Sequence, residues 1–145
     1  MDNKSFVKKL KKLNACEDAV NWCVQHGGTS AELWRDCERG DWMAWYAAKV
    51  GVDKRALVGA LADCAALSLK YYEAQYPDDK RVRECIATCR RYAKGKATEE
   101  DVRNAANSAA DAAHAAAYAA YAAAYAKTLK KCAAIFRKHF PELPL

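Results

Sequence analysis

Residues 29–50 read TSAELWRDCERGDWMAWYAAKV, and this stretch decides the fold class. Thr29 with Glu32 three residues later matches the capping box, in which each side chain bonds an otherwise unpaired backbone N–H at the start of a helix. Gly40 is expected to break that helix, and Asp41 to cap the next one. Because these are the signals of helix ends and not of hairpin turns, they predict an all-α fold.

The same helical spacing continues toward the N-terminus. A short first helix is expected through Phe6, Leu10 and Leu13, whose apolar side chains recur every three or four residues. Asn14 is expected to cap a second helix and Gly27 to end it, because glycine readily adopts the conformation that closes many helices. The chain before residue 29 therefore adds helices to the fold.

Three further helical segments follow toward the C-terminus. The first begins near Asp53 and stops at Pro77, which has no backbone N–H to continue it. Asp78 or Asp79 is expected to cap the second segment, and Gly95 to close it. The third begins after Gly95 and contains the alanine-rich part of the chain.

This last segment begins at Thr98 and Asp101 and meets no helix breaker before Pro141. Residues 105–126 are mostly alanine, the best helix former. At about 1.5 Å per residue, an unbroken helix to residue 139 would be roughly 60 Å long, which exceeds the span of a compact domain of this size. The helix should therefore kink, split or protrude.

The length of 145 residues suits one domain, residues 1–145, with a core that needs no disulfide or metal. A charged fraction of 29% beside 52% hydrophobic residues is typical of a folded chain and not of a disordered one. We expect a compact bundle of about six to seven helices, ending in a long alanine-rich helix or helix pair.

The net charge of +6 favours acidic partners. Basic residues crowd the first twelve positions and the segment 81–96. The sequence has no zinc-finger spacing, aromatic RNA-binding motif or basic zipper, so nucleic acid is disfavoured as a partner.

The seven cysteines include no CxxC pair, and no apolar signal-peptide core follows the basic start of the chain. This usage predicts a cytoplasmic protein with free thiols and no bound metal or other cofactor. A membrane span is not expected, because Asp111, His114 and three tyrosines interrupt the alanine-rich segment and alanine gives little transfer energy.

The polar residues of the alanine-rich helix form one stripe. They follow alternating spacings of three and four: Asn104, Asn107, Asp111, His114, Tyr118, Tyr121, Tyr125 and Thr128. The stripe can be a solvent-exposed face, or its tyrosines can pack in the core or form the wall of a binding groove. The flat alanine faces also favour pairing with a second copy, which predicts a homodimer.

The turn in the quoted stretch brings several indoles together. Trp34, Trp42 and Trp45 surround it, and a buried aromatic corner is the simplest interpretation. Arg35 and Arg39 can stack on these rings or pair with Asp36 and Asp41.

Several segments of the chain are similar to a known family. Residues 14–22, 33–45 and 132–141, with the alanine–tyrosine tract, resemble the small all-helical immunity proteins of bacterial and phage genomes. The most specific part is the pattern C-x-R-x-D-W-M-x-W, present as Cys37 to Trp45. The resemblance implies that the protein neutralises a toxin, or acts in counter-defence when a phage carries it, and it names no site residues.

Two functions compete, and an enzyme is disfavoured because no nucleophile–base motif is visible. The first is a non-enzymatic protein that inhibits a toxin or immune effector by binding it. The second is a phage-type sponge that sequesters a nucleotide-derived signal between arginines, aromatic rings and the polar stripe. The candidate binding residues are Arg35, Arg39, Asp41, Trp42, Trp45, Arg83, Arg90, Arg91, Asn104, Asn107, Asp111, His114, Tyr118 and Tyr121.

Overall fold

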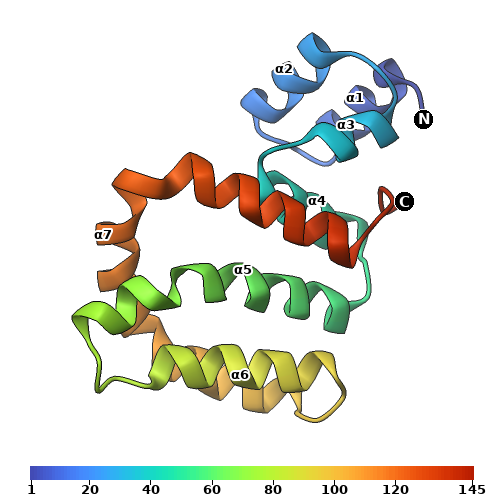
Figure 1. Ribbon diagram of the computed structural model, residues 1–145. Coiled ribbons are helices and arrows are strands. Elements are labelled where there is room, and N and C mark those ends of the chain that lie inside the picture. Colours follow the sequence, from blue (N-terminus) through green and yellow to red (C-terminus); the bar gives the residue numbers. More distant parts are fainter.

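The computed structural model of the chain is all-α, as its helix-end signals predict (Figure 1). The structure describes residues 1–109 and 127–145, together with the helical backbone that joins them. Its helices are α1 (Asn3–Lys12), α2 (Glu17–His26), α3 (Ser30–Asp36), α4 (Gly40–Val50), α5 (Lys54–Gln75), α6 (Arg81–Ala93) and α7 (Glu99–His139). The expected kink, split or protrusion of the last helix falls on residues 110–126 and lies outside the described residues.

The capping box predicted for Thr29 is present at the start of α3, and the helix start predicted at Thr98 also has one. Thr29 accepts a hydrogen bond from the backbone N–H of Glu32 at 3.3 Å, and the Glu32 carboxylate accepts one from the Thr29 N–H at 2.6 Å. Thr98 and Asp101 form the same reciprocal pair at the start of α7. Asp53 caps α5 by accepting from the N–H of Ala56. These three caps confirm the local predictions.

The caps predicted for two other helices are wrong. Asn14 has a φ of 61° and lies outside α2, whose N-cap position is Cys16. Asp41 does not cap α4, because it lies inside the helix and Arg39 occupies the N-cap position. The Asp41 carboxylate instead binds the guanidinium of Arg39.

Asp79 fulfils only part of the cap predicted for α6. The N-cap position is Lys80, yet Asp79 Oδ1 accepts a hydrogen bond from the Arg81 backbone N–H at 3.0 Å. The Tyr72 hydroxyl donates to the other oxygen of this carboxylate at 2.5 Å. Bonds from Arg81 and Tyr72 hold the pKa of Asp79 well below its ordinary value. This carboxylate thus ties the end of α5 to the start of α6.

Gly40 does not break a helix, since α3 already ends at Asp36 and Gly40 begins α4. Its φ is not positive, so the position does not need the backbone freedom of glycine. What the position requires is a residue without a side chain. A Cβ on Gly40 would lie 2.4 Å from Cys132 Cβ and 2.7 Å from the backbone nitrogen of Ala133. The start of α4 therefore rests directly on the backbone of α7.

The first four helices share their core with the end of the chain. The large side chains that are most completely buried there are Leu33, Met43 and Phe136. The indole N–H of Trp34 donates to the Phe140 carbonyl at 2.9 Å, and the Tyr46 hydroxyl donates to the Pro144 carbonyl at 3.1 Å. The buried aromatic corner is thus confirmed at Trp34, which is 5% exposed.

Helix α5 lies between α4 and α6 in the arrangement of the helices (Figure 1). The described N-terminal part of α7 lies beside α6, and its C-terminal part lies beside α4. Features on the α3–α4 turn and features on α6 therefore face different parts of the surface. Among the described residues, no helix has the length and the apolar character that crossing a membrane requires.

Candidate functional site

The candidate residues form two separate groups. Five of them, Arg35, Arg39, Asp41, Trp42 and Trp45, make a surface that we call the α3–α4 corner. Arg83, Arg90 and Arg91 lie on α6, and the exposed residues Asn104 and Asn107 lie at the start of α7. Asp111, His114, Tyr118 and Tyr121 lie outside the described residues. Because α5 separates α4 from α6, the structure does not bring the two described groups together.

The arginines of the α3–α4 corner are paired with neighbouring carboxylates. Arg39 donates to both oxygens of Asp41, at 2.9 and 2.7 Å, and its guanidinium carbon lies 4.3 Å from the ring centroid of Trp42. Arg35 forms the same bidentate pair with Asp36, at 2.8 and 3.0 Å. Burial raises the pKa of Asp41, but the bonds and charge of Arg39 outweigh it and lower the pKa overall. Pairing and stacking therefore both occur at Arg39.

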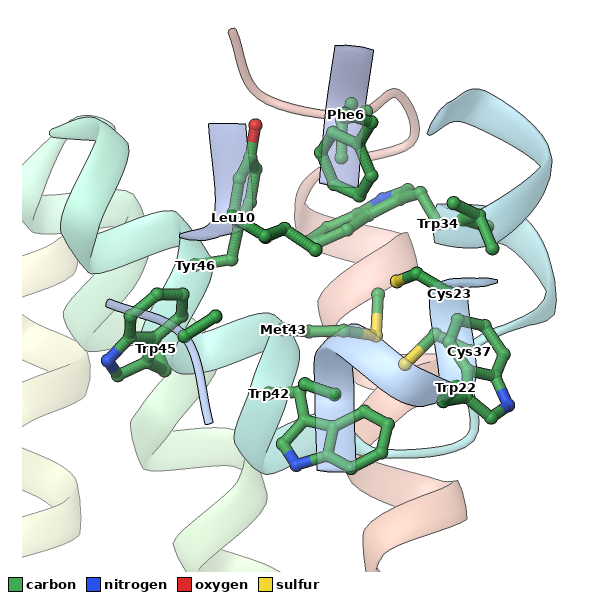
Figure 2. A pocket seen from close by; sticks show the side chains of 14 residues that line it. Phe6, Leu10, Trp22, Cys23, Trp34, Cys37, Trp42, Met43, Trp45 and Tyr46 are labelled. Carbon is green, nitrogen blue, oxygen red and sulfur yellow. The ribbon is translucent and has the colours of Figure 1, made fainter. Parts of the chain in front are cut away.

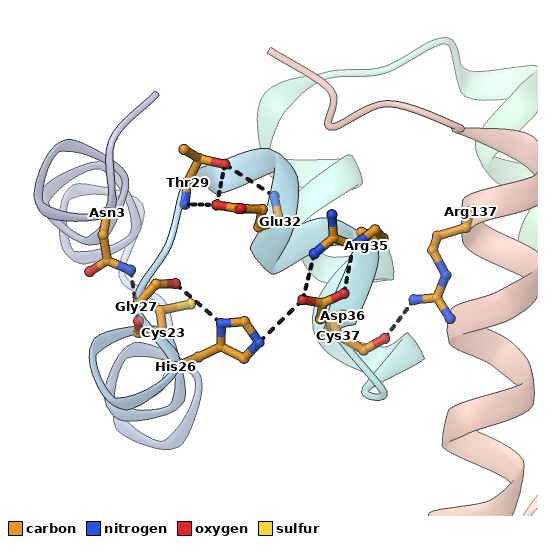
Figure 3. A network of polar contacts seen from close by, with 10 residues as sticks. All are labelled: Asn3, Cys23, His26, Gly27, Thr29, Glu32, Arg35, Asp36, Cys37 and Arg137. Atoms are coloured by element: carbon orange, nitrogen blue, oxygen red, sulfur yellow. Dashed lines mark hydrogen bonds and ion pairs between the residues drawn. The ribbon is translucent and has the colours of Figure 1, made fainter.

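A line of polar and aromatic contacts continues from this corner to α2, and Figure 3 shows its polar part, from Arg35 through Asp36 to His26. His26 Nε2 lies 3.4 Å from the Asp36 carboxylate. The His26 ring is 5.0 Å from the Trp22 ring, centroid to centroid, and Trp22 is 6.1 Å from Trp42. Side chains from α2, α3 and α4 thus present one continuous surface, which is rich in residues that dominate protein interfaces.

A small apolar cavity lies beneath the α3–α4 corner (Figure 2). Its volume is about 50 Å³, and its lining includes Trp22, Trp34, Trp42 and Met43. All four lining side chains belong to the shared core or pack against it. A space of this size and lining cannot hold a polar ligand such as a nucleotide. The corner offers an outer surface for binding.

A second surface lies along α6, on the side that faces α5. We call it the α6 groove: a depression of about 310 Å³ lined by Leu69, Arg83, Ile86, Ala87, Arg90, Arg91 and Lys94. Ile86 is buried and Ala87 is half-buried, whereas the four cations are exposed. The groove therefore combines an apolar floor with a basic rim.

Two arginines of the rim are paired with carboxylates of α5. Arg83 donates to both oxygens of Glu73, each at 2.6 Å, and Arg90 donates to Asp63 at 3.0 and 2.9 Å. Arg91 instead donates to the Thr88 hydroxyl at 2.9 Å. Among the residues whose side chains the structure describes, the rim thus mixes two paired cations with two, Arg91 and Lys94, that contact no carboxylate.

Sequence reasoning missed some residues of this surface. Lys94 lies four positions after Arg90, so the helical period places it on the same face. This spacing alone was enough to count Lys94 among the candidate binding residues. Asp63 and Glu73 belong to another helix, and no local pattern pairs them with α6. Their contribution became visible only in the three-dimensional structure.

Asp63 also bonds a third helix, since His139 Nε2 on α7 lies 2.9 Å from its second oxygen. Burial raises the pKa of Asp63, but the hydrogen bonds from His139 and Arg90 outweigh it and hold the pKa below 3.8, its ordinary value. Asp36, Asp41, Glu73 and Asp79 also have lowered pKa values. The folded state therefore favours these carboxylates in their charged form.

We predict that acid destabilises the protein through these carboxylates. A lowered pKa in the folded state adds stability that is complete above the pKa of the unfolded chain and is lost as the pH falls through the folded value. The melting temperature should hold from pH 7 down to about pH 5 and fall below about pH 4. Circular dichroism melts across this range check it. Asp63→Asn should reduce the acid-induced loss, and an unchanged pH profile would contradict the assignment.

The seven cysteines, all of them among the described residues, form no disulfide. All seven are free, and Cys23 and Cys37 are buried, as expected of cysteines that pack as small apolar residues. In the part of the chain that the structure describes, no three His, Cys, Asp or Glu side chains are grouped as metal ligands.

Comparison with known proteins gives one match. A family model described as "Imm-5 like putative immunity protein" matches residues 51–143. This range contains α5, α6 and most of the chain after them, including the alanine–tyrosine tract and residues 132–141. The segments 14–22 and 33–45 lie before it. Neither the search of curated proteins nor the search of solved structures found a match.

Proposed function

The chain belongs to the Imm-5 like immunity protein family, and from this premise we propose that it neutralises a bacterial toxin or immune effector by binding it, without catalysis. The observation that carries the proposal is the family match over residues 51–143. Inhibition by binding requires a surface on which a few side chains supply most of the binding energy. The protein has two surfaces of that kind.

Both surfaces support a protein partner. The α3–α4 corner presents Arg39 stacked on Trp42, and tryptophan and arginine are the residues most enriched at interface hot spots. The α6 groove presents arginines around an apolar floor, which is the usual contrast between a polar rim and an apolar centre. Either surface can cover the active site or the binding surface of another protein.

No observation in the described ranges favours the alternative, a sponge for a nucleotide-derived signal. Such a site would need the aromatic rings of the α3–α4 corner beside the polar stripe of α7. The described part of that stripe, Asn104 and Asn107, lies near α6 on the other side of α5. The cavity at the corner is apolar and has only about 50 Å³.

We predict that co-expression of this protein with its cognate toxin restores bacterial growth. The toxins to test are the products of the genes that neighbour its own. The pair should co-purify as a stable complex, and the released toxin should keep its mass and its activity because binding leaves it chemically intact. An unrelated basic helical protein at equal expression serves as the control. Lack of growth rescue, or a toxin recovered in modified form, would contradict the proposal.

A further inference from the structure

We propose that the α6 groove is the surface that contacts the toxin or effector, and that it receives an acidic protein segment in which a carboxylate side chain lies beside an aliphatic one. This inference rests on the proposed function and adds the place and the chemistry of the contact. The groove lies within the range that the family model matches, whereas the α3–α4 corner does not.

The segment that contains α6 is strongly basic, and four of its cations line this groove. Residues 80–96 contain seven basic side chains and one acidic side chain, a net charge of +6. The whole chain also has a net charge of +6, so the charges of all other residues cancel. An acidic surface is therefore attracted to α6, which raises the rate of encounter and orients the partner.

Local ion pairs leave two cations of the groove available. Arg81, Arg83 and Arg90 each contact a carboxylate of their own chain. Arg91 and Lys94 have no carboxylate within the 4.0 Å of an ion pair, among the residues whose side chains are described. Asp101 lies beyond that distance, although the charge of Arg91 contributes to lowering its pKa. These two cations are the ones that a partner's carboxylate can bind.

Arg91 is already held in place for such a contact. Its guanidinium donates to the hydroxyl of Thr88, a residue that is 6% exposed. The same hydroxyl donates to the backbone carbonyl of Glu84 at 2.8 Å, which fixes its orientation. A side chain that is oriented before binding loses less conformational entropy when the partner arrives.

The apolar floor selects a protein segment over nucleic acid. Ile86 is 5% exposed, and with Leu69 and Ala87 it lines a depression of about 310 Å³ that an aliphatic side chain can enter. A nucleic-acid backbone consists of charged phosphates and polar sugars, and it has no projecting apolar side chain to fill this floor. A continuous row of phosphates would also meet the carboxylates of Asp63 and Glu73 at the rim. One carboxylate next to one aliphatic side chain satisfies both parts of the groove.

The α3–α4 corner is the competing contact surface, and its cations are engaged within the chain. The guanidinium of Arg35 binds Asp36, and that of Arg39 binds Asp41 while it stacks on Trp42. An acidic partner would have to displace these carboxylates. Binding at α6 requires no such exchange.

The test is charge reversal at the two available cations. In the growth assay and in binding titrations with the cognate toxin, the double variant Arg91→Glu/Lys94→Glu should lose neutralisation and weaken the affinity roughly 100-fold or more. The matched control is Lys8→Glu/Lys12→Glu, which changes the net charge equally at exposed positions of α1. This control should neutralise like the unchanged protein.

Further measurements separate the outcomes. If charge reversal lowers the helical content, Arg91→Gln/Lys94→Gln replaces it and should still weaken binding at least tenfold. Full neutralisation by both groove variants would overturn the inference while the proposed function stands. Loss through Arg39→Ala alone would overturn it in favour of the α3–α4 corner. Failure of the unchanged protein to neutralise would remove the proposed function and this inference together.

A labelled poly-uridine 20-mer at physiological salt tests the nucleic-acid alternative. We expect no stoichiometric binding. Tight binding that Arg91→Glu/Lys94→Glu abolishes, with toxin neutralisation unaffected, would show that the groove serves RNA and would overturn the inference.

Discussion

Replacing Gly40 with alanine should lower the free energy of unfolding by about 3 kcal/mol or more, at the upper end of the cost of overpacking. The added Cβ would lie 2.4 Å from Cys132 Cβ and 2.7 Å from the Ala133 nitrogen. Real Cβ atoms essentially never approach other heavy atoms within 3.0 Å. Neither of these two atoms can move aside by rotation of a side chain, because the positions of both are fixed by the backbone of α7. The variant must separate α4 from α7, where the shared core lies.

Gly59→Ala is the matched control for this prediction. Gly59 lies inside α5, and its added Cβ would meet the Ala93 Cβ at 3.1 Å, a tight contact that a small shift relieves. Alanine also gains up to about 1 kcal/mol over glycine inside a helix. Urea unfolding followed by circular dichroism should therefore show a small change for Gly59→Ala and a large loss for Gly40→Ala. Equal stability of the two variants would mean that α4 and α7 are not in backbone contact.

Phe136→Ala should cost about 3–5 kcal/mol, the range found when a buried phenylalanine is truncated. Phe136 is 1% exposed, and its ring is 6.2 Å from that of Phe140, centroid to centroid. The loss of this ring leaves a cavity between α7 and the first four helices. It also weakens the hydrogen bond that the Trp34 indole donates to the Phe140 carbonyl. A domain of this size has only about 5–15 kcal/mol of stability, so this loss removes a large share of it and should lower the melting temperature by roughly 10 °C or more.

Leu61→Ala is the control for the second prediction. Leu61 is 43% exposed on α5, so its truncation removes little buried area and should cost less than about 1 kcal/mol. Thermal melts of both variants give the comparison. A similar loss of stability at positions 61 and 136 would show that the core is not centred on Phe136.

Local signals in the sequence predicted the helices well, and long-range contacts decided where those predictions failed. The capping boxes at Thr29 and Thr98 involve residues three positions apart, so they are visible in the sequence. The role of Gly40 depends on Cys132, a residue that lies more than ninety positions later in the chain. Glycine has the same appearance in the sequence whether it supplies backbone freedom or space.

The candidate site shows the same difference between local signals and long-range contacts. The period of α6 places Arg83, Arg90 and Arg91 on related faces, and in the structure all three line one groove. Which of these charges are paired depends on carboxylates of α5, and the sequence does not show that pairing. The separation of the α3–α4 corner from α6 depends on the position of α5 between them. A list of suitable residue types therefore combined two surfaces into one site.

The bond between Trp34 and Phe140 joins residues 106 positions apart, and it determines the order in which a newly made chain can fold. The first four helices leave the ribosome while their core partners on α7 are still untranslated. At about 5–20 residues per second, the indoles of α2–α4 wait roughly 5–20 seconds for Phe136 and Phe140. During that interval they are exposed to chaperones, proteases and other nascent chains. Neutralisation of a toxin, the proposed function, would therefore begin only after translation has passed the last turn of α7.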